Sequence, residues 1–396
     1  MPRRRQTFYI AQIGSYSAID PSTNGAGYLW VPASNVPTKQ EELAHLETNF
    51  ATGSVYPTAP EAGPDGGMVE LLTHIGGFAT AGGDGAAPPA LDWFDILMNS
   101  AFGSYVERSG EGLAVGSTTG SLVLDTDLLS IYDLAPVYEA GLAPGRTQWA
   151  RIEADAGSGT YGTVAPLFAT APTTAGVCYA TRMYRPSDTQ AYLAAVFVDD
   201  NVRTHTMLGV RTILQSISAD HGRSFMAKWR LEFDSKTPDA GKTALPNPGA
   251  APAFRTLDAR LSPVYFNGTA VETAKIDINM NPTVQVIGAT AATQGRGGNE
   301  IVSYRPEIIV TPQRTGAIED LRRAVTEGPL LVQLGGGVLA GGQLGTMALH
   351  LDNAFVADCK DVDDNGVMRQ QLTIRVADAS RFSGTTRAPV VQLARA

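Results

Sequence analysis

Cysteine is almost absent: the 396 residues include only Cys178 and Cys359. Two cysteines this far apart match no zinc-ligand spacing and cannot form a disulfide framework. The N-terminal stretch MPRRRQTFYIAQIG is basic but lacks the apolar segment of a secretory signal. We therefore expect both thiols to be reduced and buried.

Long apolar runs and clustered positive charge are also missing. Runs such as residues 330–334 have the length of a strand and end in glycine, so no membrane insertion is expected. Charged residues make up 17% of the chain, its net charge is −9, and its one tight basic cluster is residues 3–5. Tight nucleic-acid binding needs clustered Lys and Arg, so we do not expect it from the folded body.

No combination of residues typical of an enzyme is present. The five histidines show none of the spacings of zinc proteases, and no G-x-S-x-G motif occurs; they are His45, His74, His205, His221 and His350. Residues 335–340 match G-x-G-x-x-A, but the glycine-rich stretch that follows is unsuited to starting a helix. We predict a loop between two strands there.

Residues 361–366 (DVDDNG) imitate the start of a calcium-binding loop. The position of the closing bidentate Glu falls at Leu372, so the calcium interpretation loses most of its ligands. Asp, Asn and Gly favour turns, and a hairpin turn is the better prediction. We expect no catalytic, cofactor-binding or metal-binding residues, no cofactor, and no enzymatic activity.

What the sequence does contain is glycine (42), proline (24) and 43% hydrophobic residues, a composition typical of many short strands joined by turns. We predict a mainly β protein with a few short helices, including residues 90–103 and 315–328 and a helix-like patch or turn at 41–46. The predicted organisation is an N-terminal arm and loop (1–40), a first domain (41–235), a linker (236–254) and a second domain (255–396). We expect residues 104–172 to be an insertion of irregular β structure.

The two domains show the same order of elements. In the first, a strand at 66–80 leads to the helix 90–103, an apolar strand at 191–200, and a hairpin over 204–235. In the second, a strand at 300–312 leads to the helix 315–328, a strand at 330–337, and a hairpin over 344–376. Identities are few, and chance similarity among β-rich segments remains an alternative to duplication.

Four stretches of the second domain, together with residues 208–235 of the first, resemble the tail tube (major tail) proteins of long-tailed bacteriophages. The stretches are 273–282 (TAKIDINMNP), 300–328, 330–359 and 368–380. The resemblance covers about two thirds of the chain and concerns pattern rather than a diagnostic motif. It implies two tandem β-sandwich or barrel-like tube domains, each flanked by a helix.

The resemblance also implies a function: a virion structural protein, made in the host bacterial cytoplasm and located in the tail. Its partners would be copies of itself, in rings of three with pseudo-sixfold symmetry or rings of six, and other tail proteins. Stacked rings would form a channel for transient, non-specific passage of DNA, and the acidic balance of the chain agrees with that. A β-sandwich receptor- or carbohydrate-binding virion protein is the alternative, and it would require exposed aromatic side chains.

Overall fold

The computed structural model describes most of the chain. The described residues are 7–13, 29–34, 38–46, 61–78, 83–138, 147–162, 164–168, 170–187, 191–199, 203–220, 223–233, 235–238, 257, 262–288, 296–313, 315, 318, 320, 327–335, 345–364, 366–377 and 391–396. They form an antiparallel, mainly β structure, which confirms the predicted fold class at that level. No helix among these residues has the length and hydrophobicity needed to cross a membrane.

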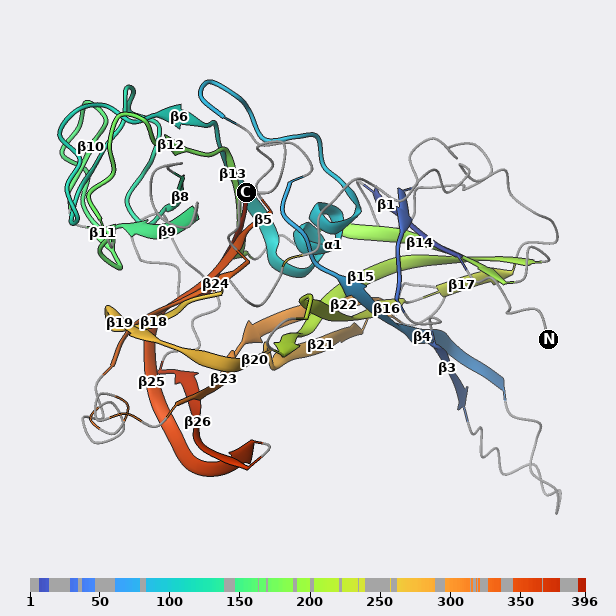
Figure 1. Ribbon diagram of the computed structural model, residues 1–396. Helices are drawn as coiled ribbons and strands as arrows, with labels where there is room; N and C mark the ends of the chain where they lie inside the picture. The colour runs from blue at the N-terminus through green and yellow to red at the C-terminus, as the bar shows by residue number, and fades with distance from the viewer. Residues whose placement is uncertain are drawn as a thin grey trace, which may run out of the picture.

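A central sheet of eight strands runs through the molecule (Figure 1). In pairing order it consists of β3 (Thr38–Leu46), β4 (Glu61–His74), β16 (Met226–Phe233), β15 (Arg203–Asp220), β20 (Thr273–Asn279), β23 (Glu307–Pro312), β26 (Val367–Val376) and β25 (Met347–Asp364). The hairpin of β21 (Pro282–Gly288) and β22 (Arg296–Tyr304) continues β20 and β23.

The two longest strands, β15 and β25, each have 18 residues and pass from the central sheet into a flanking sheet. The first flanking sheet is β2 (Leu29–Val31), β1 (Thr7–Ile13), β14 (Tyr192–Asp199), the N-terminal part of β15, and β17 (Ser235–Pro238). The second is β19 (Thr269–Val271), β18 (Val264–Phe266), β24 (Gly328–Leu334), the N-terminal part of β25, β27 (Val391–Arg395), β13 (Thr181–Pro186) and β5 (Gly103–Arg108).

The pairing order is the same in residues 7–238, the first half, and residues 262–395, the second half. In the first half the order is β2–β1–β14–β15–β16–β4–β3, and β17 also pairs with β15. In the second half it is β19–β18–β24–β25–β26–β23–β20, and β27 also pairs with β25. The two halves therefore share one topology.

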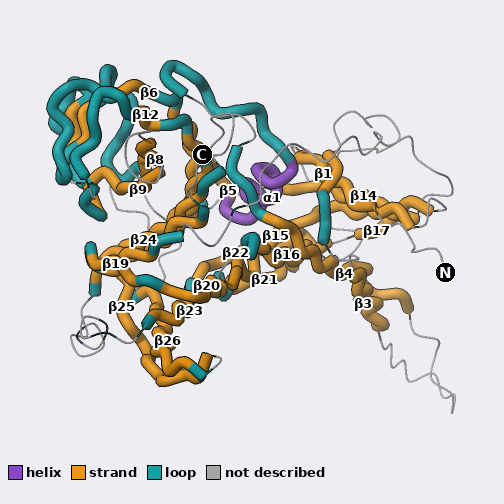
Figure 2. Tube along the Cα trace, viewed as in Figure 1, coloured by secondary structure: helices purple, strands orange, loops and turns teal. Residues whose placement is uncertain are grey.

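The helix α1 (Trp93–Phe102) forms within the predicted segment. Asp92 caps its N-terminus and exchanges bonds with Asp95 in a capping box, and Gly103 ends it in a left-handed conformation with φ 90°. Figure 2 shows α1 at the centre of the molecule, enclosed by strands. It packs on the central sheet, where the ring of Phe94 lies edge-on to the ring of Trp229 with 5.6 Å between the ring centroids.

The described residues within 109–180 form a β module of short strands. Its sheet is β11 (Val164–Ala165), β9 (Thr147–Ile152), β8 (Leu134–Tyr138), β12 (Val177–Cys178) and β6 (Glu111–Gly112), with β7 (Leu122–Val123) and β10 (Thr160–Tyr161) paired beside it. The module has its own apolar core, which includes Leu124, Tyr161 and Phe168. The hairpin strands β5 and β13 connect it to the second flanking sheet.

Several local expectations need revision. The helix-like patch 41–46 is wrong: these residues belong to β3, because pairing with β4 outweighs their helix propensity. The stretch expected to be an arm contains β1, which lies between β2 and β14. Of the expected linker (236–254), residues 236–238 belong to β17, and 239–254 lie outside the described residues. Most of the helix expected at 315–328 also lies outside them, but the Thr315 hydroxyl accepts a bond from the Ile318 N–H at 3.4 Å, as an N-cap would.

Candidate functional site

The two motifs that imitate ligand sites occur at strand ends. Gly335 follows β24 with φ 71°, and residues 336–340 lie outside the described part of the chain. Asp363 accepts a bond from the Gly366 N–H at 2.7 Å in the turn between β25 and β26, so the predicted hairpin is confirmed. Leu372 is fully buried in β26, and its side chain has no oxygen that could bind calcium.

The histidine and cysteine side chains that the structure describes do not converge on one site. Among the described residues no group of three His, Cys, Asp or Glu side chains could hold a metal ion. His350 is buried in β25, and His74 ends β4. Cys178 is buried and free, and burial raises the pKa of its thiol to about 12, so it is unreactive. Cys359 forms no disulfide but is only half-buried, so the expectation of burial fails there.

The tryptophans do not form a binding face. Trp93, Trp149 and Trp229 are 3% exposed or less, and each packs in an apolar cluster. Trp30 is half-buried in β2. A carbohydrate-binding surface would present such rings to solvent, so this observation is unfavourable to the binding-module alternative.

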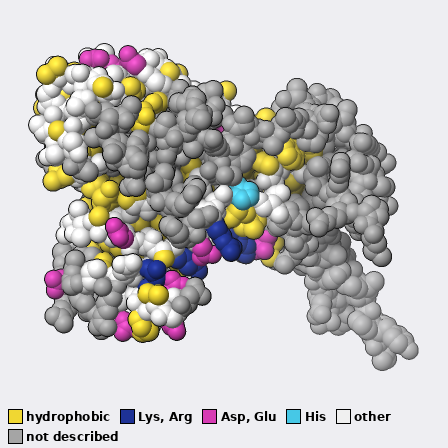
Figure 3. Space-filling model, in the orientation of Figure 1, with side chains coloured by type: hydrophobic (Ala, Val, Ile, Leu, Met, Phe, Trp, Pro, Cys, Tyr) yellow, Lys and Arg dark blue, Asp and Glu magenta, His cyan; other side chains and the backbone are white. Residues whose placement is uncertain are grey.

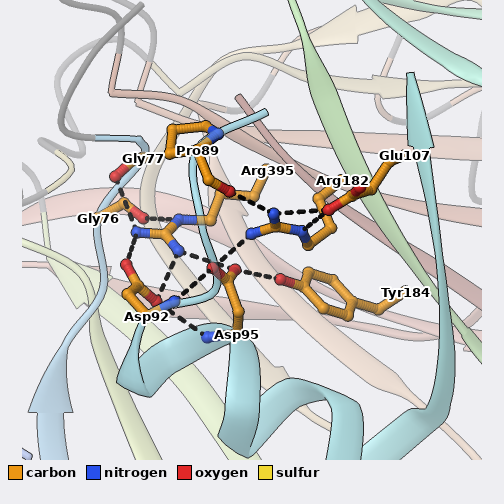
Figure 4. A network of polar contacts seen from close by, with 9 residues as sticks. All are labelled: Gly76, Gly77, Pro89, Asp92, Asp95, Glu107, Arg182, Tyr184 and Arg395. Atoms are coloured by element: carbon orange, nitrogen blue, oxygen red, sulfur yellow. Dashed lines mark hydrogen bonds and ion pairs between the residues drawn. The ribbon is translucent and has the colours of Figure 1, made fainter. Parts of the chain in front are cut away.

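A buried network of charges lies at the N-terminus of α1 (Figure 4). Arg395 of β27 donates to Asp92 at 2.7 Å and to Asp95 at 2.8 Å, and to the backbone carbonyls of Gly76 and Gly77. Its side chain is 1% exposed. Burial by itself would raise the pKa of the Asp92 carboxyl. The charge of Arg395 and its hydrogen bond have the larger combined effect, so the pKa of Asp92 is lowered.

A second buried arginine completes this network. Arg182 of β13 donates to Asp95 at 2.5 Å and to Glu107 at 2.6 Å, and the Tyr184 hydroxyl also donates to Asp95. Burial and the charge of Asp95 raise the pKa of Tyr184 well above its usual value. Because these carboxylates already accept bonds from fixed donors, the network ties β27, β13 and α1 together rather than offering a reactive group.

The face of the central sheet that points away from α1 carries charge. Along β16, Ala227 and Trp229 are buried towards α1, whereas Lys228 and Arg230 alternate onto the opposite face. Five basic side chains on that face each lie within 3.2 Å of a carboxylate, in the pairs Lys228–Glu70, Arg230–Glu232, Lys275–Asp277, Arg369–Asp364 and Arg375–Glu307. Figure 3 shows basic and acidic side chains intermixed over the strands near its centre. Positive charge here is largely neutralised.

Both ends of the central sheet are open edges within the described residues. β3 pairs with β4 on one side only, and residues 358–364 of β25 pair only with β26. Open edges present unpaired N–H and C=O groups and tend to recruit another strand. These two edges, with the charged face between them, form the candidate functional site.

Little of this site was visible in the sequence. The sequence predicts no site residues, and the paired charges lie far apart along the chain, as with Glu307 and Arg375. The buried network was missed as well; its one local signal was the Asp92–Asp95 spacing of a capping box. The alternation of polar residues along β16 and β26 is a local signal of a solvent-facing side, but it does not show which strands are neighbours.

Replacing His350 with leucine is expected to stabilise the protein and reduce its acid sensitivity. The imidazole is 1% exposed, and neither ring nitrogen has a partner among the described residues. Burial lowers its pKa well below the usual value, and the charge of Arg151 acts in the same direction. The folded protein thus holds this histidine neutral, whereas the unfolded chain protonates it below about pH 6.5, so stability falls as pH falls below that value.

Urea unfolding of both proteins near neutral pH and at about pH 5.5 measures this effect. We expect His350→Leu to gain about 1–3 kcal/mol near neutral pH, because an unpaired buried polar group is removed. The gain should grow by up to about 1.4 kcal/mol for each pH unit below 6.5. A gain that does not change with pH would contradict the buried neutral imidazole.

Comparison with known proteins does not identify the chain: no family model matches it, and no curated protein sequence matches it.

Proposed function

We propose that this chain is a structural subunit that assembles with copies of itself through the two open edges of its central sheet. In this proposal three chains close into a ring, rings stack into a tube, and the tube is the tail tube of a bacteriophage, through which DNA passes. The role is structural rather than catalytic. One observation carries the proposal: the chain already contains one copy of the junction that would join neighbouring subunits.

That internal junction pairs β15 of the first half with β20 of the second, with Ser216 opposite Asn279 and Asp220 opposite Lys275. By the shared topology, β25 corresponds to β15, and Thr38, where β3 begins beside β4, corresponds to Asn279, the last residue of β20. Among the described residues, β25 and β3 are the open edges of the central sheet. A junction between chains that places the C-terminal part of β25 beside the start of β3 would therefore repeat the Ser216–Asn279 pairing of the internal junction, and it would pair the two open edges in the ring.

The register of the external junction follows from the bulges. Gln215 of β15 and Ala357 of β25 are the extra residues at equivalent bulges, so Ser216 corresponds to Asp358. In the second half, Asn279 lies opposite Glu307, which lies opposite Arg375. In the first half, Thr38 lies opposite Glu70, which lies opposite Arg230. Since Arg230 and Arg375 are equivalent, Thr38 corresponds to Asn279. The proposal thus predicts that Asp358 lies opposite Thr38 of the neighbouring chain.

The geometry of the ring supports a conduit. Each chain supplies the eight strands of its central sheet. Three chains give about 24 strands spaced about 4.8 Å apart, and so a barrel radius of about 18 Å, larger if the strands tilt. Since α1 and the flanking sheets lie on one side of the central sheet, the charged face would line the channel. Its paired charges and the net charge of −9 suit passage of DNA without tight binding.

A disulfide between chains tests the junction. We expect Asp358→Cys with Thr38→Cys, in a Cys359→Ser background, to form intermolecular disulfides upon oxidation, because directly opposite strand residues have suitable spacing. Denaturing electrophoresis should show covalent trimers, and electron microscopy should show rings with a central channel. The matched control moves one partner by two residues, Asp358→Cys with Gln40→Cys, and should cross-link poorly. Persistent monomers at high protein concentration would contradict the proposal.

A further inference from the structure

One charged pair occurs at the same place in both halves of the chain. On β4 and β16, Glu70 lies directly opposite Arg230; on β23 and β26, Glu307 lies directly opposite Arg375. These two Glu–Arg positions are equivalent in the shared topology. Trp229 and Ile374 each lie opposite the residue just before the bulge of the neighbouring strand, and Arg230 and Arg375 are the next residues along the chain. Both pairs are on the charged face of the central sheet.

Neighbouring positions on this face are not repeated in the same way. Lys228 corresponds to Thr373 of the second half, and Ser216 corresponds to Asp358. Each half therefore carries its own further charges around a common Glu–Arg pair. The common pair is the feature that a ring built from both halves would display with sixfold regularity.

The contacts bind each cation to an acid. Arg375 donates through Nε to Glu307 at 2.7 Å and through a terminal nitrogen at 2.6 Å. In the first half the acids and bases form a group of four, in which Glu70 pairs with Lys228 at 3.2 Å and Arg230 with Glu232 at 2.6 Å. Arg375 is 57% exposed, so a polyanion could reach it if the acid were absent.

Fold stability is a weak explanation for this arrangement. Exposed ion pairs contribute little to folding because solvent screens the charges and both side chains lose freedom. A channel wall gives a stronger reason. Unpaired arginines facing DNA displace counterions from phosphates and bind it, whereas arginines bound to carboxylates offer phosphate little net attraction.

We infer that these pairs form a girdle around the channel, in which Glu70 and Glu307 hold the neighbouring cations so that a DNA duplex passes without being retained. The inference rests on the proposed ring. Three chains would carry two pairs each at one level of the channel. Removing the two acids would leave cations facing the duplex and turn the girdle into a DNA-binding site.

Co-sedimentation of DNA with assembled tubes tests this inference. Wild-type tubes and the Glu70→Gln/Glu307→Gln variant are mixed with labelled linear duplex DNA over a range of salt concentrations. We expect wild-type tubes to retain little DNA and the variant to retain it, with affinity falling at least about tenfold between roughly 50 and 200 mM salt. Covalently closed circular DNA cannot thread a preformed tube and should not be retained by either protein.

Three controls separate pairing from other causes. Lys228→Gln/Arg375→Gln removes the two cations bonded to Glu70 and Glu307 and should retain no DNA. The exchange Glu307→Arg/Arg375→Glu keeps one pair with its direction reversed and should behave like wild type. Glu153→Gln/Asp352→Asn removes the two carboxylates bonded to Arg151, outside the charged face, and should also behave like wild type. The cross-link between positions 358 and 38, introduced into each protein, confirms assembly.

The outcomes distinguish the two proposals. If wild-type protein forms neither rings nor cross-linked trimers, the proposed function fails and the girdle with it. If the Glu-to-Gln tubes assemble but retain no linear DNA, only the girdle is overturned. Equal retention of circular DNA, or retention by the Glu153→Gln/Asp352→Asn tubes, would assign the binding to the outer surface and would also overturn it.

Discussion

Replacing Arg395 with methionine is expected to lower the free energy of unfolding by about 3–5 kcal/mol, because it leaves buried carboxylates without their cation. The guanidinium bonds Asp92 and Asp95 and two backbone carbonyls, and its side chain is 1% exposed. Methionine fills similar space but donates no hydrogen bond. Since β27 lies between β13 and β25, the loss should loosen the link between α1 and the second flanking sheet.

Chemical denaturation followed by tryptophan fluorescence measures this change. Arg395→Lys should also lose stability, because an ammonium group cannot reproduce a planar set of five donors. Arg375→Met is the matched control: its side chain is 57% exposed and bonds Glu307, so a change of about 0–1 kcal/mol is expected. Similar decreases in the free energy of unfolding for Arg395→Met and Arg375→Met would show that the buried network contributes no more to stability than an exposed ion pair.

Replacing Trp149 with alanine is expected to cost about 3–5 kcal/mol and to separate the β module from the second flanking sheet. The indole is fully buried between the module and that sheet, in contact with a cluster that includes Met183, Leu331 and Ala394. Its Nε1 donates to the Thr346 hydroxyl at 2.8 Å. Alanine would leave a large cavity and remove this bond at the same time.

Amide hydrogen exchange distinguishes loss of this contact from general unfolding. In Trp149→Ala, protection should fall in β9 and in β24, on the two sides of the contact. Phe168→Ala is the control within the core of the module, where Phe168 is 4% exposed. It should lower protection in the module and leave β24 unchanged. If both variants affected β24 equally, the module would not depend on Trp149 for its attachment.

Local chemistry made several elements predictable. The helix over 93–102 follows from its apolar pattern and the terminating Gly103. The Asn267–Gly268 turn follows from the need for positive φ at both positions, and the angles are 46° and 77°. The repeated order of strands was also visible, because each strand has its own apolar pattern and its own flanking turns.

The pairing of strands that lie far apart in the sequence could not be predicted. Residues 41–46 have the composition of a helix but pair with β4. The cross-strand partners Glu307 and Arg375 could not be matched from sequence, because nothing local fixes which distant strands pair. The register between β25 and β26 also depends on a bulge, at Ala357. A single extra residue at a bulge reverses which face each following side chain occupies.

The sequence by itself determined the mainly β class, the helix α1, the tight turns and the repeated order of elements, because each depends on neighbouring residues. Only the tertiary structure decided that Arg395 would meet Asp92, that the module would pack through Trp149, and that β3 and β25 would remain as open edges. These features depend on contacts between residues hundreds of positions apart. Their partners are chosen by packing and hydrogen-bond satisfaction in the folded chain, and no local pattern records that choice.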